Sequence, residues 1–510
     1  MGERIFDLDL RVLAVFLVLL FSLTYWLHPD KPSPDGGWLS WADQGEIDRI
    51  ARSLADFKVP ERPFFPVGYP LLGALFIKFF YPYHFFIPNL ALYVVTVCLW
   101  YLIARRNLEA PYNFIFLLLL LFGTQITFYF SIPWTHFLTV GLASVVFYLF
   151  FMEGELSLRK ILLLSIASGL LMFVRVPEFM SLLPVVGFVF WRGVKGSDRR
   201  KMASYILCFA APLVILLALF FYTNSIFYSS PFTIGYHVPV PGTMHTQEDV
   251  LHMYSLTSFI QKSYAFIVNP EPVFRTDPPC GFISLPVLGY SPFFLFAVFG
   301  LYRFVTANRR LGVLGFSCII LTMFVSLFGY FGNDTLSPLS LKYFALRKLV
   351  IWLPLWTILS VLGMASLLEH RKNPPMERKA ARMLSVLVVS IVLIPPLLAY
   401  LGLSRIPYNF NASTQSTEYR VGDTVPVNAV ISDRKLRGVP GKVVHGTYAL
   451  DSEPSSLQPM EFKDEGNGTY TSTFIPEKAG VYNIVLMSPS FGAGIPDKIV
   501  NPTVRITVEP

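Results

Sequence analysis

The stretch Gly36–Leu54, which reads GGWLSWADQGEIDRIARSL, follows the first long apolar run of the chain and gathers acids and bases in an otherwise apolar sequence. Its later apolar residues recur at helical spacing, at Ile47, Ile50, Ala51 and Leu54. This pattern predicts a short amphipathic helix over residues 42–57, lying in the membrane interface just outside the first spanning helix. Two interpretations are open: the acids belong to a catalytic site, or the segment merely anchors the first helix with interfacial tryptophans.

The composition places the chain among multi-pass membrane proteins. Its 510 residues are 54% hydrophobic and only 15% charged, whereas soluble chains carry about 25% charged residues. Apolar runs near the length of about 20 residues that crosses a bilayer predict about eleven transmembrane helices. They fall at residues 10–27, 84–104, 112–130, 136–152, 161–174, 177–191, 203–222, 286–302, 311–330, 349–368 and 383–402.

The distribution of positive charge predicts the topology. The formal net charge of +8 does not indicate nucleic acid, because Lys and Arg form short clusters between the apolar runs, as the positive-inside rule produces. These clusters share one side of the membrane if the N-terminus is cytoplasmic. The long loops 28–83 and 223–285, and everything after residue 403, then lie outside. We therefore expect a protein of the plasma membrane, or of the endoplasmic reticulum in a eukaryote.

The tail over residues 404–510 differs from the rest of the chain. It is polar, with alternating patches at Thr424–Ile431 and Gly468–Phe474 that Gly, Pro, Asn and Asp punctuate. Short strands at such spacing predict a β-sandwich of about 100 residues. The stretch Asp464–Tyr482 resembles the closing hairpin of bacterial immunoglobulin-like modules, which implies a fold and not an activity. The sequence thus predicts an all-α membrane domain over residues 1–403 and an all-β domain after it.

Residues with a full charge at neutral pH are nearly absent from the apolar spans between residues 84 and 402. Arg175 and Glu178 are the exceptions, and they fall at a predicted outer turn. Transporters usually place acids, bases or broken helices near the middle of the membrane, so this pattern argues against transport and favours chemistry at the outer surface. The four cysteines show no paired spacing, which indicates neither a disulfide framework nor a cysteine metal site.

Six stretches of the first 402 residues resemble, in order, motifs of the GT-C superfamily of polyprenyl-phosphate-dependent glycosyltransferases, which includes protein O-mannosyltransferases and lipid A aminoarabinose transferases. They are the acidic first-loop helix Asp43–Leu54, the stretch Phe65–Leu72, the outer turn Val174–Glu178, the segment Tyr228–Tyr236, the stretch Gly281–Pro292, and Phe344–Lys348. The chain departs from the pattern where Ala345 replaces a glycine and Lys348 replaces a tyrosine. The resemblance implies a GT-C-like membrane domain.

The resemblance also implies a reaction. A sugar would move from a polyprenyl phosphate to a hydroxyl of a glycan, lipid or protein at the outer membrane surface. Attack by a hydroxyl needs a carboxylate that takes its proton, a role that we assign to Asp43, with Glu46 as the second acid.

Cations should stabilise the negative charge that grows on the leaving phosphate. Arg347 offers a planar fork for two phosphate oxygens, with Lys348, Lys342 and Arg175 as assistants. On the acceptor and sugar side the expected residues are Tyr69, Tyr236 and His237.

Simpler interpretations of these residues stay open. Arg347 and Lys348 would also suit lipid headgroups, although two cations on the predicted outer side oppose the positive-inside bias and favour a functional role. Arg175 with Glu178 better suits a local ion pair within one helical turn. The sequence specifies no cofactor and no metal site, although a divalent cation stays open because some members of the superfamily use one. Asp43 with Glu46 or Asp48 would then supply ligands.

Other functions share the predicted topology. A ligase or polymerase of lipid-linked glycans would change only the acceptor. A glycan-lipid transporter or an assembly scaffold would need no base, so a scaffold predicts that losing Asp43 has no effect.

Overall fold

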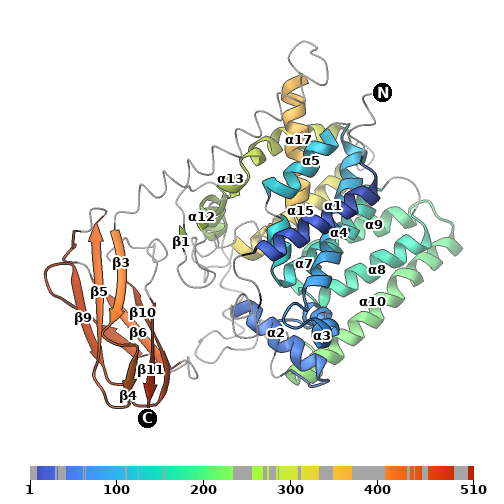
Figure 1. The fold of residues 1–510 in the computed structure, drawn as a ribbon. Coiled ribbons are helices and arrows are strands. Elements are labelled where there is room, and N and C mark those ends of the chain that lie inside the picture. The colour runs from blue at the N-terminus through green and yellow to red at the C-terminus, as the bar shows by residue number, and fades with distance from the viewer. Residues whose placement is uncertain are drawn as a thin grey trace.

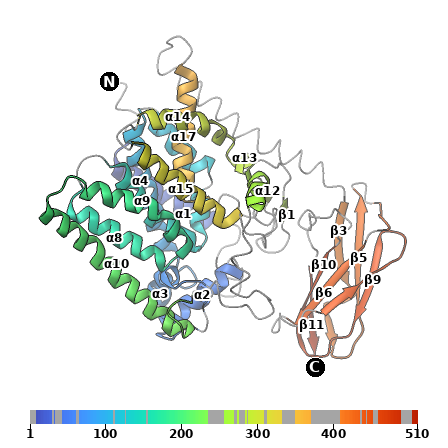
Figure 2. The same ribbon diagram turned by 180° about the vertical axis from the view of Figure 1, so that it is seen from behind.

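The computed structural model describes residues 8–28, 32, 42–60, 63, 65–109, 112–124, 126–152, 156–233, 256–267, 273–274, 283–284, 287–307, 312–331, 349–369, 408–433, 437–441, 443–450, 458–487 and 503–510. Up to residue 369 these are mainly helices, and from residue 408 they are strands. Figures 1 and 2 show a bundle of helices and a separate β-sandwich.

The helical part consists of helices of unequal length. They are α1 (Leu10–Leu27), α2 (Ala42–Ala55), α3 (Gly68–Phe80), α4 (Phe86–Asn107), α5 (Tyr112–Leu118), α6 (Ile126–Ser131), α7 (Thr135–Phe151), α8 (Leu158–Met172), α9 (Val176–Val194), α10 (Arg199–Tyr228), α12 (Leu256–Ile267), α13 (Val287–Tyr290), α14 (Ala297–Ala307), α15 (Gly312–Phe331) and α17 (Leu353–Glu369). A two-residue ladder, β1 (Val273–Phe274) with β2 (Ile283–Ser284), lies between α12 and α13.

Helix α1 shows how apolar composition becomes a membrane helix. Asp9 begins it, and its carboxylate accepts a hydrogen bond from the backbone N–H of Arg11 at 2.6 Å. Every fourth residue is then buried, at Leu13, Leu17, Phe21 and Tyr25, while apolar residues on the other faces stay exposed. Within the described part of the chain, α1, α4 and α10 are long and apolar enough to cross a membrane. These helices mark an integral membrane protein.

The predicted spans fall on helices where the structure describes them, but two of them are not single helices. The run 286–302 contains α13, a 3₁₀ helix at Pro292–Phe296 and the beginning of α14. The run 112–130 was expected to be one helix, but it contains α5, a π-helical segment at Leu119–Gly123 and α6. The hydroxyl of Thr124 donates to the carbonyl of Leu120 at 2.5 Å, and that of Ser291 donates to the carbonyl of Gly123 at 2.6 Å. These hydroxyls donate hydrogen bonds to carbonyl groups at the point where the helix is interrupted, and so take the place of backbone donors. The last predicted span, 383–402, lies outside the described residues.

Helices α14 and α17 cross with their backbones in contact. A Cβ atom on Gly300 would overlap the carbonyl oxygen of Leu359, and one on Gly363 would overlap that of Phe296. Small residues allow such close approach, which is a common way for helices to associate in membranes.

The strands form two sheets. They are β3 (Tyr408–Thr414), β4 (Glu418–Arg420), β5 (Val425–Asp433), β6 (His445–Leu450), β7 (Gln458–Glu461), β8 (Lys463–Asp464), β9 (Thr469–Phe474), β10 (Gly480–Met487) and β11 (Thr503–Glu509). One sheet has the order β4-β11-β10-β6-β7 and the other β3-β5-β9-β8, and only the pair of β11 with β4 is parallel.

The alternating apolar residues seen in the sequence line the core of the sandwich. On β5 every second residue from Val425 to Ile431 is buried, and these side chains share one core with Ile484 on β10 and Ile506 on β11. The prediction of a helical membrane part followed by an all-β sandwich is confirmed. The likeness to immunoglobulin-like modules stays a prediction, and the predicted boundary at residue 403 lies outside the described residues.

Candidate functional site

Helix α2 confirms the predicted amphipathic helix. Ile47, Ile50 and Ala51 are buried, and they form a small core with Tyr69 of α3 and other apolar residues. Figures 1 and 2 show α2 and α3 together at one end of the helical part, beside the end of α10. The buried apolar side of α2 thus packs this helix against the bundle. The acids of α2 are thereby held in position relative to α3.

The start of α3 is joined to the turn between α8 and α9. The backbone N–H of Gly68 donates to the carbonyl of Phe173 at 2.9 Å. A Cβ on Gly68 would lie 2.6 Å from that oxygen, so only glycine permits this approach. Val174 then packs in the same small core as α2 and α3. Two stretches separated by about a hundred residues of sequence are therefore neighbours in space.

Asp43 lies in the first turn of α2 and is half-buried. Its neighbour Gln44 is buried, and the Gln44 amide donates to the carbonyl of Pro133 at 3.4 Å. This contact places the beginning of α2 beside the connection between α6 and α7. The first turn of a helix favours a carboxylate, because its unpaired N–H groups carry partial positive charge. Asp43 is therefore a carboxylate at the edge of the bundle in a setting that suits its negative charge.

Glu46 is held by its own helix. Both of its carboxylate oxygens accept hydrogen bonds from the Arg49 guanidinium, at 2.7 and 2.8 Å. Such a bidentate pair restricts the carboxylate to one orientation and lowers its availability as a base. The role of Glu46 as the second acid of a catalytic site stays a prediction.

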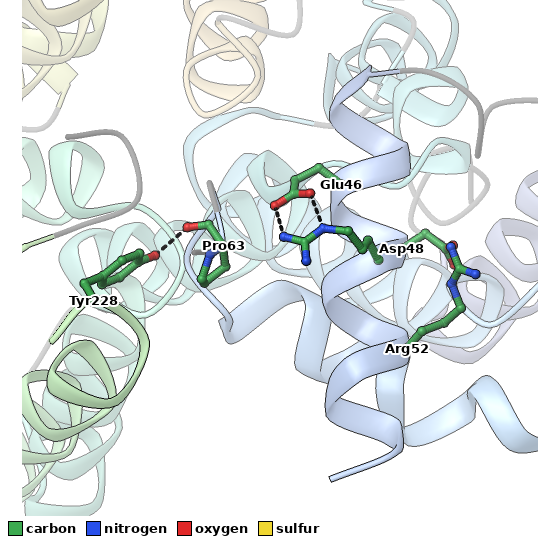
Figure 3. A network of polar contacts seen from close by, with 6 residues as sticks. Glu46, Asp48, Arg52, Pro63 and Tyr228 are labelled. Atoms are coloured by element: carbon green, nitrogen blue, oxygen red, sulfur yellow. Dashed lines mark hydrogen bonds and ion pairs between the residues drawn. The ribbon is translucent and has the colours of Figure 1, made fainter. Parts of the chain in front are cut away.

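Asp48 is the buried acid of α2. One carboxylate oxygen pairs with the Arg52 guanidinium at 2.8 Å, and the other lies 3.3 Å from Nε2 of His84, which is fully buried just before α4. Figure 3 shows Asp48 and Arg52 on the opposite side of α2 from Glu46. Burial raises the pKa of Asp48, and the nearby Arg52 opposes that rise. Burial likewise lowers the pKa of His84 to about 4. The Asp48 carboxylate and the His84 imidazole thus lie in contact, which places α2 beside the start of α4.

Arg175 forms the predicted local ion pair. Its Nε contacts a carboxylate oxygen of Glu178, and both side chains are largely buried. Binding of a donor phosphate by Arg175 stays a prediction. It would require the guanidinium to contact Glu178 and the phosphate at the same time.

Tyr69 is fully buried. Its hydroxyl donates to the side-chain oxygen of Asn89 at 2.7 Å, and its ring stacks on Phe85 with centroids 5.1 Å apart. In this structure Tyr69 is part of the support under α2, and its predicted contact with a sugar stays a prediction.

The end of α10 reaches the connection between α2 and α3. The hydroxyl of Tyr228 donates to the carbonyl of Pro63 at 2.6 Å, and Figure 3 shows this contact on the Glu46 side of α2. Helix α10 ends at Ser229, which adopts a left-handed conformation with φ of 57°. A fourth stretch is thereby brought to the same end of the bundle.

The remaining predicted site residues lie outside the described residues. These are Arg347, Lys348, Lys342, Tyr236 and His237. Among the residues that are described, no group of three or more His, Cys, Asp and Glu side chains gathers as a metal site would require.

Comparisons with known proteins give limited similarity. No protein-family model and no curated protein matches the chain. ArnT from Cupriavidus metallidurans bound to undecaprenyl phosphate is similar at a TM-score of 0.47 and 13% identity, over 77% of this chain and 64% of that chain. The apo oligosaccharyltransferase of Archaeoglobus fulgidus is similar at a TM-score of 0.45 and 14% identity, over 77% of this chain and 56% of that chain.

The oligosaccharyltransferase AglB of Archaeoglobus fulgidus, in complex with an inhibitory peptide and a dolichol-phosphate, gives a TM-score of 0.44 at 12% identity, over 77% of this chain and 56% of that chain. The chain thus matches less than two thirds of the length of each of these structures. At these TM-scores the similarity does not establish a shared activity.

Proposed function

We propose that the chain is a membrane glycosyltransferase that moves a sugar from a polyprenyl phosphate to a hydroxyl acceptor on the outer face of the membrane. One observation supports this most. Four stretches that resemble GT-C motifs meet at one end of the bundle: α2, the start of α3, the turn before α9 and the end of α10. Motif resemblances that arose by chance would not be expected to lie together in the folded protein.

Asp43 is the proposed general base. It would accept the proton of the acceptor hydroxyl as the new C–O bond forms, while the sugar–phosphate bond breaks and the polyprenyl phosphate leaves. Asp43 lies in the first turn of α2, which is the first of the four stretches that meet at this end of the bundle. Glu46 is held by a bidentate contact with Arg49, and Asp48 is buried against Arg52.

The donor side is proposed from the sequence resemblance. Arg347, with Lys348 and Lys342, would neutralise the leaving phosphate. Arg175 is the weaker candidate, because Glu178 already occupies its guanidinium. With the N-terminus in the cytoplasm, α2 and the sandwich would both face outward, where a lipid-linked donor and a glycan, lipid or protein acceptor could meet.

The test replaces Asp43 by Asn in the native host. Asn keeps the shape of the side chain and removes the base, so we expect at least a 100-fold loss of transfer, the size typical of general-base catalysis. Mass spectrometry of surface glycans, glycolipids and glycoproteins should then show one missing sugar, together with accumulation of a polyprenyl-phosphate sugar. The matched control is Asp56→Asn, the same chemical change at an exposed position just after α2, which should leave every glycan unchanged.

The strain that lacks the gene defines which glycans depend on the protein. If those glycans stay normal in the Asp43→Asn strain at equal membrane abundance, Asp43 is not the base, and the scaffold or transport interpretation is favoured. If the missing unit is a whole glycan instead of one sugar, the protein is a ligase or polymerase.

A further inference from the structure

The β-sandwich contains a cavity that the proposed reaction does not use. It measures about 290 Å³, near the lower end of the range for ligand pockets. Strand β6 and strand β10 contribute Tyr448 and Tyr482, the first residue of β7 contributes Gln458, and the connection between β9 and β10 contributes Glu477 and Lys478. Leu450 and Ile475 add apolar surface.

Hydrogen bonds and ring packing fix the walls of this cavity. The Tyr482 hydroxyl donates to the carbonyl of Lys478 at 3.1 Å and accepts from the N–H of the same residue at 3.3 Å. This double contact ties the connection between β9 and β10 to β10 itself. The Tyr448 ring stacks on Phe474 with centroids 4.2 Å apart. A ligand would therefore meet a site that is already ordered, which lowers the entropy cost of binding.

The chemistry of the lining favours a neutral ligand that is rich in hydroxyl groups. Glu477 and Lys478 carry opposite charges, so the cavity has no net charge with which to recognise an anion or a cation. Burial raises the pKa of Tyr448, and the charge of Glu477 raises it further, so its phenol stays protonated and can donate. Phenol, amide, carboxylate and ammonium groups together offer both donors and acceptors. Two aromatic rings supply the apolar contact that a sugar ring makes through its C–H bonds.

We propose that this cavity binds a short segment of neutral glycan. The sugar would pack against the tyrosines, while Gln458 and Glu477 accept hydrogen bonds from its hydroxyl groups. The site stands apart from Asp43 and α2 in sequence and in chemistry, so it would serve to hold a glycan on the protein and not to transform it. The proposal does not depend on the transferase activity.

The experiment measures binding by the full-length protein. The protein is reconstituted in lipid nanodiscs, because maltoside detergents are themselves sugars. Saturation-transfer NMR with neutral oligosaccharides built from glucose, galactose, mannose or N-acetylglucosamine gives the Kd for each. We expect at least one to bind, and the double substitution Gln458→Ala with Glu477→Gln to raise its Kd at least tenfold, or about 1.4 kcal/mol. Tyr448→Phe, which keeps the ring stacking, should weaken binding less.

The matched control is Glu418→Gln, an exposed acid on β4 at the far edge of the same sheet. It removes the same charge from the sandwich and should leave the Kd unchanged. The proposal fails if no neutral oligosaccharide binds saturably, or if the control weakens binding as much as the double substitution does. Saturable binding of acidic sugars alone, or of a peptide in place of sugars, would also overturn it. Loss of activity in Asp43→Asn with intact sugar binding would separate this site from the transferase.

Discussion

The three acids of α2 illustrate how contacts divide residues of one type into different roles. Glu46 is held by the half-buried Arg49, Asp48 is buried beside Arg52 and His84, and Asp43 lies in the first turn. The bidentate contact with Arg49 restrains Glu46, and burial separates Asp48 from solvent. At the scale of single residues, Asp43 stays the proposed base, and the Asp43→Asn experiment decides its role.

His84 gives a pH dependence that can be measured. Folding lowers its pKa from 6.5 to about 4 because the imidazole is buried. Between these values the unfolded chain binds a proton that the folded chain excludes, so the free energy of unfolding falls as the pH falls. The limit of this loss is about 3 kcal/mol. We expect the apparent Tm of the purified protein to drop between pH 6.5 and 4, and His84→Gln to flatten that drop.

Two features make this test specific. The raised pKa of Asp48 acts in the opposite direction at the acid end, because the folded chain then binds the extra proton, and comparing the two proteins isolates the part due to His84. His445→Gln, the same substitution at an exposed position on β6, should leave the profile as it is. An unchanged slope in the His84 variant would contradict the assignment.

Sequence reasoning identified the acidic helix but not the partners of its acids. Helical spacing places Ile47, Ile50 and Ala51 on one side, and Asp48 adjoins that side. Its burial depends on His84, which lies far along the chain and bears no spacing relation to α2. No local pattern could have paired them. The same holds for Tyr69, because its place in a sequence motif does not show that its ring packs against α2.

At the scale of elements, the crossing of α14 and α17 depends on two glycines. Each lets the backbone of one helix approach a carbonyl of the other, at Gly300 against Leu359 and at Gly363 against Phe296. Lipid offers no hydrophobic drive to bring two membrane helices together, so close packing must do so. An added methyl group would force the axes apart.

Gly300→Ala should therefore destabilise the protein by about 1–3 kcal/mol, the usual cost of overpacking. Thermal unfolding of the purified protein should show a lower apparent Tm. The control is Gly187→Ala in α9, where an added Cβ meets no atom within 4 Å. There the better helix propensity of alanine should be neutral or stabilising by up to about 1 kcal/mol. Equal effects of the two substitutions would contradict the close crossing.

The elements were largely predictable, because long apolar runs have few alternatives to a helix. The interruption near Gly123 was not predictable. It depends on the hydroxyl of Ser291, which arrives from a segment far later in the chain and satisfies a carbonyl that the break exposes. A local sequence window contains no information on that partner.

At the scale of the whole molecule, the helical bundle and the sandwich have separate hydrophobic cores. Because the two cores share no side chain, one core can unfold while the other keeps its packing. Two cores of this kind predict two unfolding transitions where a single cooperative domain would give one.

Ile484→Ala tests this division. The side chain is fully buried in the sandwich core, and its truncation should cost about 2–5 kcal/mol. Calorimetry of the full-length protein should show one transition shifted down by at least 8 °C and the other unmoved. The matched substitution Ile358→Ala, fully buried on α17, should shift the opposite transition. A common shift of both would mean that the two parts unfold as one unit.

The hydrogen bond between Gly68 and Phe173 has a consequence for biosynthesis. The chain is made from its N-terminus, and at about 5–20 residues per second the roughly 100 residues between these partners take about 5–20 s to emerge. During that interval α2 and α3 exist without Val174, which later completes their small core. The core that α2 and α3 share can therefore be completed only after the turn before α9 has been synthesised.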